Sequence, residues 1–570
     1  MKPLIIGGRD DGFGERMRAL LNAMYVARRF GLEWGFVWRD FDWGEDFLDG
    51  EVKTPIKNLP KMRELFSEDF IARYHKSELS FSYITPTLYT LHQKSIHKLL
   101  SPPFEEDWGW YMTQGDLDTY FSDVDSSEYR KSLVSCFESI AFSKRVEDIF
   151  QKAKDTAKTL GDFTALHLRS GETVFDEQYI KIWWHCRYKI FAYPLGVAAA
   201  FDELQKGRKL VLFSDDYTLL EALREYFICQ GVEDKIFIAS SFTKDLSGYE
   251  ALLFELMLMS RARTIFCSWT TGFARCACYI GNNELINIHE HYSLSQSYEA
   301  MIKFIDLKNI HPNQAAFSYF FLYLLARDLG LPFEAKERYL KQSLALHSNE
   351  NTKVFLLDLL LEHGYFEEAE ASLEAMDDLE RMGILKLLTD YPLHPTYDFH
   401  IFARYFIAPK YKHLSRFAFE IFLAFSDENS QLNAHYPYFK KMALDLFAHT
   451  FAPTPSTPLP SLTLPKRHCL AYVLGKTMIE NSHSFWGYIR MPYVLSYVKE
   501  RYLQEAADLK ARGEYYDFYE DGHSLSFQLG SALIKAHKNR YIGGYLHFIF
   551  IQVPQIKKNF KKVNDESKKH

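Results

Sequence analysis

Residues 164–172, Thr-Ala-Leu-His-Leu-Arg-Ser-Gly-Glu, decide how this chain folds. The apolar run from Thr164 to Leu168 predicts a buried strand, and the polar residues after it predict a loop at the carboxyl end of that strand. Further buried strands are predicted downstream at Leu210–Ser214, Lys235–Ala239, 264–267 and 285–288. Helical sequence lies between them around 181–206, at 217–230, at 249–261 and from about 271. This alternation predicts a parallel, doubly wound α/β sheet whose ligand-binding loops follow the strands.

The amino terminus repeats this arrangement on a smaller scale. Leu4–Ile6 predicts a buried strand, and apolar residues from Met17 to Ala27 predict a helix. The turn between them contains Gly7, Gly8, Gly12 and Gly14. Strand, glycine-rich turn and helix form the opening of a βαβ unit. The apolar run before the glycines has only four residues, so we expect a strand there rather than a signal peptide.

After about residue 310 the pattern changes to amphipathic helices. Two strings, Gly330-Leu-Pro-Phe-Glu-Ala335 and Gly364-Tyr-Phe-Glu-Glu-Ala369, lie 34 residues apart, each between two amphipathic stretches. The period and the spacing resemble the tetratricopeptide helical hairpin, so we predict a helical, repeat-like region over 309–450. A generic helical bundle is the alternative.

A proline-rich linker and a basic helical module are predicted at the end of the chain. Residues 452–465 contain five prolines, which predicts a stiff, extended linker over 451–465. Residues 466–570 contain 17 basic and 10 acidic residues, a net charge of +7 in a chain whose total is −7. Their amphipathic helix and aromatic residues lie beside lysines, which predicts peripheral attachment to an anionic membrane surface. A packed helix with a solvated lysine tail is the alternative.

Composition excludes several classes of protein. Apolar residues make up 47 % of the chain and charged residues 25 %, which is typical of a soluble globular protein. The acidic net charge argues against nucleic acid as the main partner. The seven cysteines have no spacing typical of a metal site or a disulfide framework, so we expect reduced thiols and a cytoplasmic location. The longest apolar stretch, Ala315–Ala326, is too short to span a bilayer.

Four strings of this sequence resemble the motifs of the α1,2-, α1,6- and protein O-fucosyltransferases. In chain order they are Gly12-Phe-Gly-Glu-Arg-Met17, His167-Leu-Arg-Ser-Gly-Glu172, Phe213-Ser-Asp-Asp216 and Ser268-Trp-Thr-Thr-Gly-Phe273, the last preceded by Glu255-Leu-Met-Leu-Met-Ser260. The resemblance covers about residues 1–300. It implies a two-lobed GT-B fold, with 1–155 as the acceptor-side lobe and 156–308 as the nucleotide-sugar lobe. It also implies inverting, metal-independent transfer from GDP-fucose as donor substrate, without a cofactor.

Arg169 is the first candidate catalytic residue. Glycosyl transfer breaks the bond between sugar C1 and the diphosphate, so negative charge grows on the β-phosphate. An arginine stays charged and donates two parallel hydrogen bonds, which suits it to that phosphate. We expect Gly171 to let the backbone approach the phosphates and His167 to orient the loop or to donate to phosphate. A structural ion pair for Arg169 and a hydrogen-bonded core histidine are the alternatives.

The remaining donor-binding candidates follow the other predicted strands. A carboxylate of Asp215 or Asp216 could accept hydrogen bonds from the guanine edge or the ribose, whereas a helix N-cap is the structural alternative for both. Hydroxyl and amide groups before the helix at about 271 predict an anion site, again with an N-cap as the alternative. The full donor-binding set is Gly12, Gly14, His167, Gly171, Glu172, Ser214, Asp215, Asp216, Ser268, Thr270, Thr271, Gly272 and Phe273.

Glu15 is the second candidate catalytic residue. The acceptor hydroxyl must lose a proton, and a nearby carboxylate would take it. Glu15 stands where much of the resembling family has asparagine, in a turn that faces the acceptor cleft in that fold; Asp11 and Glu172 compete for the role.

Three Asp-x-Asp pairs, at 40/42, 116/118 and 123/125, would fit a metal-dependent transferase, but a pattern that recurs so often is weak, and we expect no metal. His289-Glu-His291 could bind a metal in an extended segment, where its two histidines would share one face, but no third ligand is evident and we favour a loop at the acceptor cleft.

The sequence therefore favours a bacterial fucosyltransferase located in the cytoplasm, at the surface of the inner membrane. Its acceptor would be a hydroxyl of a lipopolysaccharide or another surface-glycan precursor, carried on a lipid. Two hypotheses compete with this interpretation: a related enzyme that uses another nucleotide sugar, and a helical-repeat scaffold that binds a nucleotide sugar without catalysis. The oligomeric state stays open, a homo-oligomer included.

Overall fold

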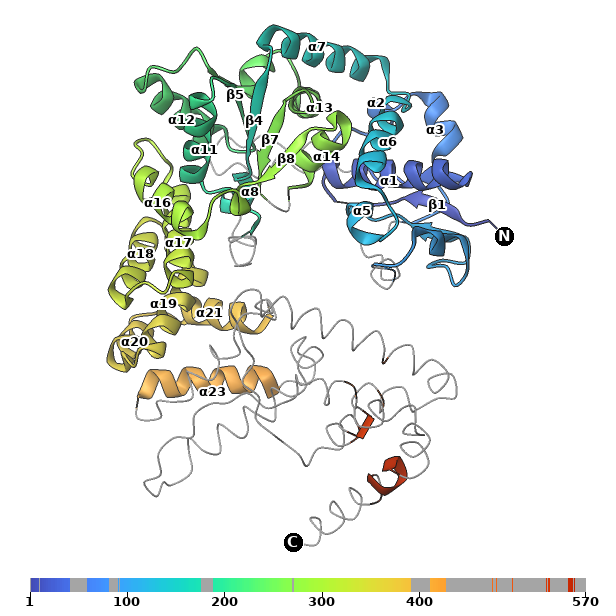
Figure 1. The fold of residues 1–570 in the computed structure, drawn as a ribbon. Coiled ribbons are helices and arrows are strands. Elements are labelled where there is room, and N and C mark those ends of the chain that lie inside the picture. The colour runs from blue at the N-terminus through green and yellow to red at the C-terminus, as the bar shows by residue number, and fades with distance from the viewer. Residues whose placement is uncertain are drawn as a thin grey trace. The chain divides into compact units, whose positions relative to one another are not determined.

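The computed structural model describes residues 2–9, 11–40, 59–80, 91, 93–175, 188–268, 271–390 and 411–426, with scattered positions between 474 and 558. The chain divides into two compact units, Met1–Ala452 and Pro453–His570. The described residues belong almost wholly to the first unit (Figure 1). The predicted linker and nearly all of the predicted basic module lie outside the described residues. No helix in the described ranges is long and apolar enough to cross a membrane.

The first sheet contains three parallel strands in the order β2-β1-β3. Strand β1 (Leu4–Gly7) lies between β2 (Trp34–Phe36) and β3 (Gly109–Tyr111), and the predicted helix is α1 (Phe13–Phe30). A side chain at Gly7 would lie 2.7 Å from the Cα atom of Leu20, so glycine is needed for α1 to pack on the sheet. The other elements of this part are α2 (Met62–Leu65), α3 (Glu68–Tyr74), η1 (Ile96–Leu100), α5 (Leu117–Tyr120) and α6 (Ser126–Glu138).

The second sheet contains five parallel strands in the order β6-β5-β4-β7-β8, which confirms the predicted parallel α/β sheet. Its strands are β4 (Phe163–Leu168), β5 (Lys209–Ser214), β6 (Ile236–Ile238), β7 (Thr264–Cys267) and β8 (Glu284–Asn287). Its helices are α7 (Lys144–Leu160), α8 (Gly171–Phe175), α11 (Tyr193–Gln205), α12 (Tyr217–Cys229), η2 (Ala239–Phe242), α13 (Gly248–Met259) and α14 (Gly272–Gly281). Helices α11 and α12 cover one face, and α7, α13 and α14 cover the other (Figure 1).

Successive residues of β4 belong to two different hydrophobic cores, as the alternation of side chains along a strand requires. Phe163 and Ala165 lie in a core that continues through α7, α13 and α14 into α1 and the first sheet. Leu166 and Leu168 lie in a second core with α11, α12 and the helices that follow the sheet. The second sheet therefore lies between the two cores and contributes side chains to both.

The helical part that follows packs directly on this second core. It contains α15 (Ile288–His291), α16 (Leu294–Phe304), α17 (Pro312–Asp328), α18 (Phe333–Leu346), α19 (Glu350–Glu362), α20 (Phe366–Glu374), α21 (Asp378–Asp390) and α23 (Lys412–Ser426). Gly330 and Gly364 both adopt left-handed conformations, with φ of 66° and 78°, and they occupy the turns α17–α18 and α19–α20. This matches the repeat of 34 residues, but membership of the tetratricopeptide class stays a prediction.

One expectation about local structure needs correction. His289 and His291 lie neither in a loop nor in an extended segment: they belong to the short helix α15, where His289 Nε2 lies 3.1 Å from the backbone oxygen of Ile190. Because a helix turns successive side chains through about 100°, the two rings do not share one face. Of the helical sequence predicted around 181–206, the described part contains α11 from Tyr193 to Gln205, and residues 181–187 lie outside the described residues.

Candidate active site

The loop after β4 holds Arg169 in an ion pair with Asp215, which follows β5. Both side chains are less than one-fifth exposed, and Oδ1 of Asp215 also accepts a hydrogen bond from the backbone nitrogen of Ser170 at 2.9 Å. Gly171, with φ of 23°, lies so close that a side chain there would meet the Asp215 carboxylate at 2.6 Å. The structure therefore brings Arg169, Gly171 and Asp215 together, and it shows the ion pair that was the structural alternative for Arg169.

His167 lies at the carboxyl end of β4, with its ring 5.6 Å from that of Phe273. It is buried, and burial together with the charge of Arg169 lowers its pKa to about 3. Its Nδ1 atom has no hydrogen-bond partner among the described residues. At this pKa the imidazole is neutral, and a neutral imidazole is a weaker donor to phosphate than an imidazolium. This favours a role for His167 in orienting the loop over a role in neutralising phosphate charge.

We predict that His167 makes the folded protein sensitive to acid. Its pKa is about 3 in the folded state and about 6.5 in an unfolded chain, so the unfolded state binds the extra proton between these values. Stability is therefore lost as the pH falls from about 6.5 towards 3. In the His167→Gln variant, the thermal midpoint should fall less steeply between pH 7 and pH 4 than in the wild type. His97→Gln, at an exposed histidine, is the matched control; equal slopes in all three proteins would contradict the prediction.

Asp216 and Ser214 are tied into the protein around the end of β5. Oδ1 of Asp216 accepts a hydrogen bond from the backbone nitrogen of Leu219 at 3.0 Å, which is the N-cap of α12. Ser214 Oγ donates to the backbone oxygen of Leu168 at 2.7 Å and accepts from the backbone nitrogen of Asp216 at 3.0 Å. Asp216 is fully buried, and burial raises its pKa. The structure thus shows the capping alternative for Asp216, and direct contact of either residue with a donor stays a prediction.

The segment before α14 contains Ser268, Thr271, Gly272 and Phe273. Ser268 Oγ lies 2.7 Å from Thr271 Oγ1 and donates to the backbone oxygen of Lys189. Thr271 occupies the N-cap position of α14 without a side-chain hydrogen bond to the helix. The N-terminal amides of α14 therefore have no side-chain cap among the described residues, as an anion site needs. Thr270 lies outside the described residues.

The glycine-rich turn before α1 and the segment before α14, far apart in the sequence, meet at this point. A side chain at Gly14 would lie 2.5 Å from the carbonyl carbon of Gly272, and a side chain at Gly272 would lie 2.2 Å from Oε1 of Glu15. The first turn of α1 and the first turn of α14 therefore touch through their backbones. This contact brings Glu15 to the same edge of the second sheet as the loop before α14. Gly12, the N-cap of α1, has open space around its Cα atom.

Burial raises the pKa of the Glu15 carboxyl, and the opposite charge of Arg18, 2.9 Å away, works against that rise. The two competing candidates differ from it. Asp11 forms an ion pair with Arg9, and the side chain of Glu172 lies outside the described residues although α8 itself is described. We therefore retain Glu15 as the candidate base, because burial raises its pKa and so increases its affinity for a proton.

Two further residues of this region were missed in the sequence. Lys189 is largely buried, and its pKa falls to about 8 because of burial and the nearby charge of Arg169. Glu255 in α13 is buried, its pKa rises to about 8, and its Oε1 atom has no partner among the described residues. Burial, and after it the nearby Glu255 carboxylate, raises the pKa of Tyr217, the residue after Asp216. Glu255 is the first residue of the string Glu255–Ser260 that resembles a fucosyltransferase motif, so the sequence pointed to it. No feature of the surrounding sequence distinguished Lys189 from other lysines.

Asp116 joins α1 and α14 beside the site. Its Oδ1 accepts a hydrogen bond from Arg18 at 3.1 Å, its Oδ2 accepts one from Arg275 at 2.7 Å, and the hydroxyl of Tyr279 donates to the same carboxylate. Burial would raise the pKa of Asp116, but the charges of Arg18 and Arg275 together hold it below its ordinary value. Both carboxylate oxygens of Asp116, which belongs to the second Asp-x-Asp pair, are therefore already bound by arginines. The described residues contain no group of three or more histidine, cysteine, aspartate or glutamate side chains placed to hold a metal.

The arrangement can bind an anion and accept a proton. Lys189, the N-terminus of α14 and Arg169, whose charge Asp215 balances in this structure, lie at the edge where β4, β5 and β7 end. Parallel sheets of this kind hold ligands at the carboxyl ends of their strands. Glu15 adds a carboxyl of raised proton affinity, brought to that edge by the contact between α1 and α14.

Comparison with known proteins gives one match to a family model. Residues 464–562 match a domain of unknown function, DUF8374, so the match covers the C-terminal part of the chain and none of the residues described above. No curated protein matches this chain.

Among solved structures, the chain is similar to the fucosyltransferase NodZ from Bradyrhizobium, with 14 % identity, a TM-score of 0.29, and coverage of 49 % of this chain and 92 % of that one. The same enzyme described as an α-1,6-fucosyltransferase soaked with GDP-fucose gives 14 % identity, a TM-score of 0.28, and coverage of 49 % and 93 %. POFUT1 in complex with GDP-fucose gives 13 % identity, a TM-score of 0.27, and coverage of 50 % and 96 %. TM-scores this low carry no weight for fold or activity, which rest on the residues themselves.

Proposed function

We propose that this protein is an inverting, metal-independent glycosyltransferase that moves fucose from GDP-fucose to a glycan hydroxyl, and that its two sheets form the lobes of a GT-B fold. One observation carries the proposal: Arg169 directly follows the central strand of the second sheet, in a loop where Gly171 lies against Asp215, and its guanidinium pairs with Asp215. A planar, permanent cation at the carboxyl end of a parallel sheet is suited to a diphosphate.

The leaving diphosphate is the group that these cations would stabilise. As the bond between sugar C1 and the diphosphate breaks, charge develops on the β-phosphate, and fixed donors there lower the barrier. Arg169 would exchange part of its contact with Asp215 for that phosphate, and Lys189 would add a second positive charge. The N-terminus of α14 would add its backbone amides. Because the protein supplies this charge, we expect transfer to need no metal ion.

Glu15 is the proposed general base. Inversion requires the acceptor hydroxyl to attack the sugar from the side opposite the diphosphate, and a carboxylate beside that hydroxyl would take its proton. Glu15 lies on α1, in the part of the chain that carries the first sheet, and its raised pKa makes the ionised carboxylate a better proton acceptor.

Glu255 is the proposed recognition residue for the guanine base. A buried carboxyl oxygen without a partner is costly unless a ligand supplies donors, and the guanine edge carries two neighbouring N–H donors. Binding those donors would favour the ionised carboxylate and offset the burial that raises its pKa. This assignment replaces Asp216, whose carboxylate is already used within the protein.

A panel of nucleotides tests the proposal. GDP and GDP-fucose should raise the thermal midpoint of the full chain, since a ligand at a hundred times its Kd stabilises a protein by about 2.7 kcal/mol. UDP and ADP derivatives should raise the thermal midpoint less than the guanine nucleotides do. In the Glu255→Gln variant, the difference between guanine nucleotides and the others should be smaller than in the wild type. Release of GDP from GDP-fucose should continue in EDTA. If no nucleotide stabilises the protein, the proposal of an enzyme is wrong. If another nucleotide sugar stabilises the protein more than GDP-fucose does, only the identity of the donor changes.

The acceptor and the cellular location are part of the same proposal. We propose a lipid-linked precursor of lipopolysaccharide or another bacterial surface glycan, with residues 466–570 binding the cytoplasmic face of the inner membrane. The support is the charge of +7 beside aromatic residues in that segment. Each basic residue near an anionic bilayer contributes on the order of 1 kcal/mol.

We therefore predict that the full-length protein co-sediments with anionic liposomes at low salt and is partly released at high salt, because salt screens the attraction. A protein truncated at Pro465 should remain in the supernatant and still bind GDP-fucose, since the proposed donor site lies in the first unit. Neutral liposomes are the control. Loss of donor binding on truncation, or the same sedimentation with and without residues 466–570, would contradict the prediction.

A further inference from the structure

Gln314 links the helical part of the chain to the loop that carries Arg169. It lies in the first turn of α17 and is 2 % exposed. Its side-chain amide donates to Oδ2 of Asp216 at 2.6 Å and also to the hydroxyl of Ser170. Both acceptors are fully buried. A residue beyond every donor motif of the sequence thus contacts two of the loops that those motifs form.

The hydrogen bonds continue from Gln314 to the proposed catalytic arginine. Ser170, which Gln314 holds through its hydroxyl, donates its backbone nitrogen to Asp215 at 2.9 Å. Asp215 in turn pairs with the guanidinium of Arg169. Asp216 is held from both sides, by Gln314 on one oxygen and by the backbone of α12 on the other. The two loops also contact each other directly, through Ser170 and Asp215, and Gln314 adds one donor from α17 that is common to both.

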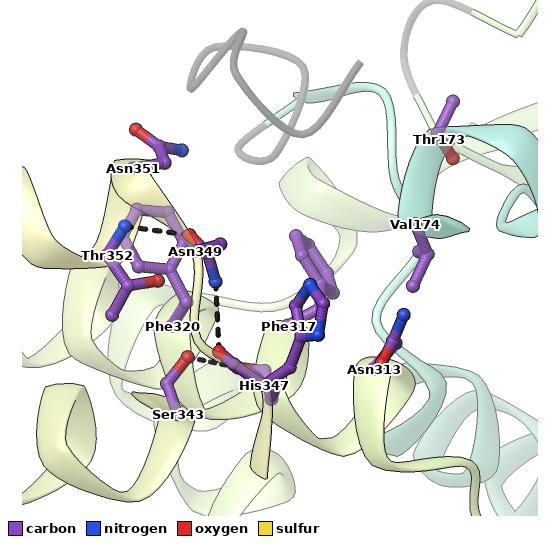
Figure 2. Close-up of a pocket in the computed structure, with 11 residues that line it drawn as sticks. Thr173, Val174, Asn313, Phe317, Phe320, Ser343, His347, Asn349, Asn351 and Thr352 are labelled. Carbon is purple, nitrogen blue, oxygen red and sulfur yellow. Dashed lines mark hydrogen bonds between the residues drawn. The ribbon is translucent and has the colours of Figure 1, made fainter. Parts of the chain in front are cut away.

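Apolar packing and hydrogen bonds both hold this junction. Val174 of α8 and Phe317 of α17 belong to one buried core, and Figure 2 shows a small pocket that these two residues line together with Thr173 and Asn313. The hydrogen bonds of Gln314 add a directional constraint to this packing.

We propose that Gln314 is a positioning residue for sugar transfer, and that the helical part acts on the donor site through it. The inference rests on the proposed function of Arg169. If Gln314 is replaced, Ser170 and Asp216 lose a common donor, and the Arg169–Asp215 pair is no longer held at a single distance from the phosphate. Small misplacements of such groups cost up to about a hundredfold in rate.

Gln314→Met tests the proposal, because methionine keeps the length of the side chain and removes its hydrogen bonds. The matched control is Ser318→Ala, one turn further along α17, where the serine is equally buried and its hydroxyl has no partner among the described residues. We expect kcat for GDP-fucose to fall tenfold or more in Gln314→Met, with a smaller change in KM, and to stay within twofold of wild type in Ser318→Ala. Equal effects of the two variants on kcat would overturn the proposal.

Hydrogen exchange in the free protein provides a readout that does not depend on the reaction. Amides of residues 169–175 should exchange at least tenfold faster in Gln314→Met and at the wild-type rate in Ser318→Ala. If Gln314→Met does not fold, Ser170→Ala removes one of the same hydrogen bonds without altering α17, and unchanged exchange and kcat in that variant would overturn the proposal. If the wild type binds no nucleotide, the proposed function fails, while the exchange rates still decide whether Gln314 holds the loop.

Discussion

Replacing Arg169 with alanine is expected to lower the rate of fucose transfer by about 10²–10³ while the protein stays folded. Loss of one fixed donor to a developing negative charge costs about 3–4 kcal/mol in enzymes that stabilise such charge through hydrogen bonds. Arg169→Lys should recover little of this rate, because a single ammonium cannot form the two parallel hydrogen bonds of a guanidinium. Steady-state kinetics with GDP-fucose, together with the thermal midpoint of each variant, provide the measurement.

The contact with Asp215 supplies the control for this experiment. In the free protein the two side chains neutralise each other, so Arg169→Ala leaves the Asp215 carboxylate without that counter-ion. The double variant Arg169→Ala/Asp215→Asn removes this charge, and it should recover stability without recovering the rate. Transfer within a few-fold of wild type in Arg169→Ala would show that the leaving group is stabilised elsewhere.

Replacing Asp116 with alanine is expected to lower the free energy of unfolding by about 3 kcal/mol. Asp116 is the common partner of Arg18, whose side chain is 4 % exposed, and of Arg275. Its removal takes one of two carboxylate partners from Arg18, which keeps Glu15, and one partner from Arg275; loss of a buried partner is far more costly than loss of an exposed pair. Urea unfolding of the full chain, followed by tryptophan fluorescence, measures the effect.

Asp162→Ala is the matched control for the Asp116 variant. Asp162 pairs with Arg263 at 3.2 Å, and both side chains are 60 % exposed. Exposed pairs contribute little, so this variant should stay within about 0.5 kcal/mol of wild type. If Asp116→Ala is no less stable than Asp162→Ala, the arginines do not depend on Asp116 and the contact between α1 and α14 is held by other interactions.

Much of the second sheet could be predicted because its information is local. The apolar runs at Thr164–Leu168 and Leu210–Ser214 became β4 and β5, and the polar strings after them became the loops of the candidate site. Asp216 shows the limit of the same reasoning: an aspartate before a helix serves equally well as a ligand contact or an N-cap. The structure shows the cap, with the carboxylate fully buried.

The residues that sequence reasoning missed are placed by contacts between distant parts of the chain. Gln314 meets Ser170 across 144 positions, and Asp116 meets Arg275 across 159. Neither pair carries a local signal, because a glutamine in the first turn of a helix and an aspartate before a short helix are both ordinary. Lys189 is similar, since its lowered pKa depends on burial and on Arg169, which only the folded chain provides.

The division of β4 between two cores has a consequence for how the chain matures during synthesis. Leu166 and Leu168 lie in one core with α11 and α16, and these two helices contact α17, which leaves the ribosome well over a hundred residues later than β4 itself. Until then, the outer side of this core exposes apolar side chains to water or to a chaperone. A nascent chain that ends near residue 308 therefore contains every string that resembles a fucosyltransferase, yet it lacks the helices that complete the core behind its central strand.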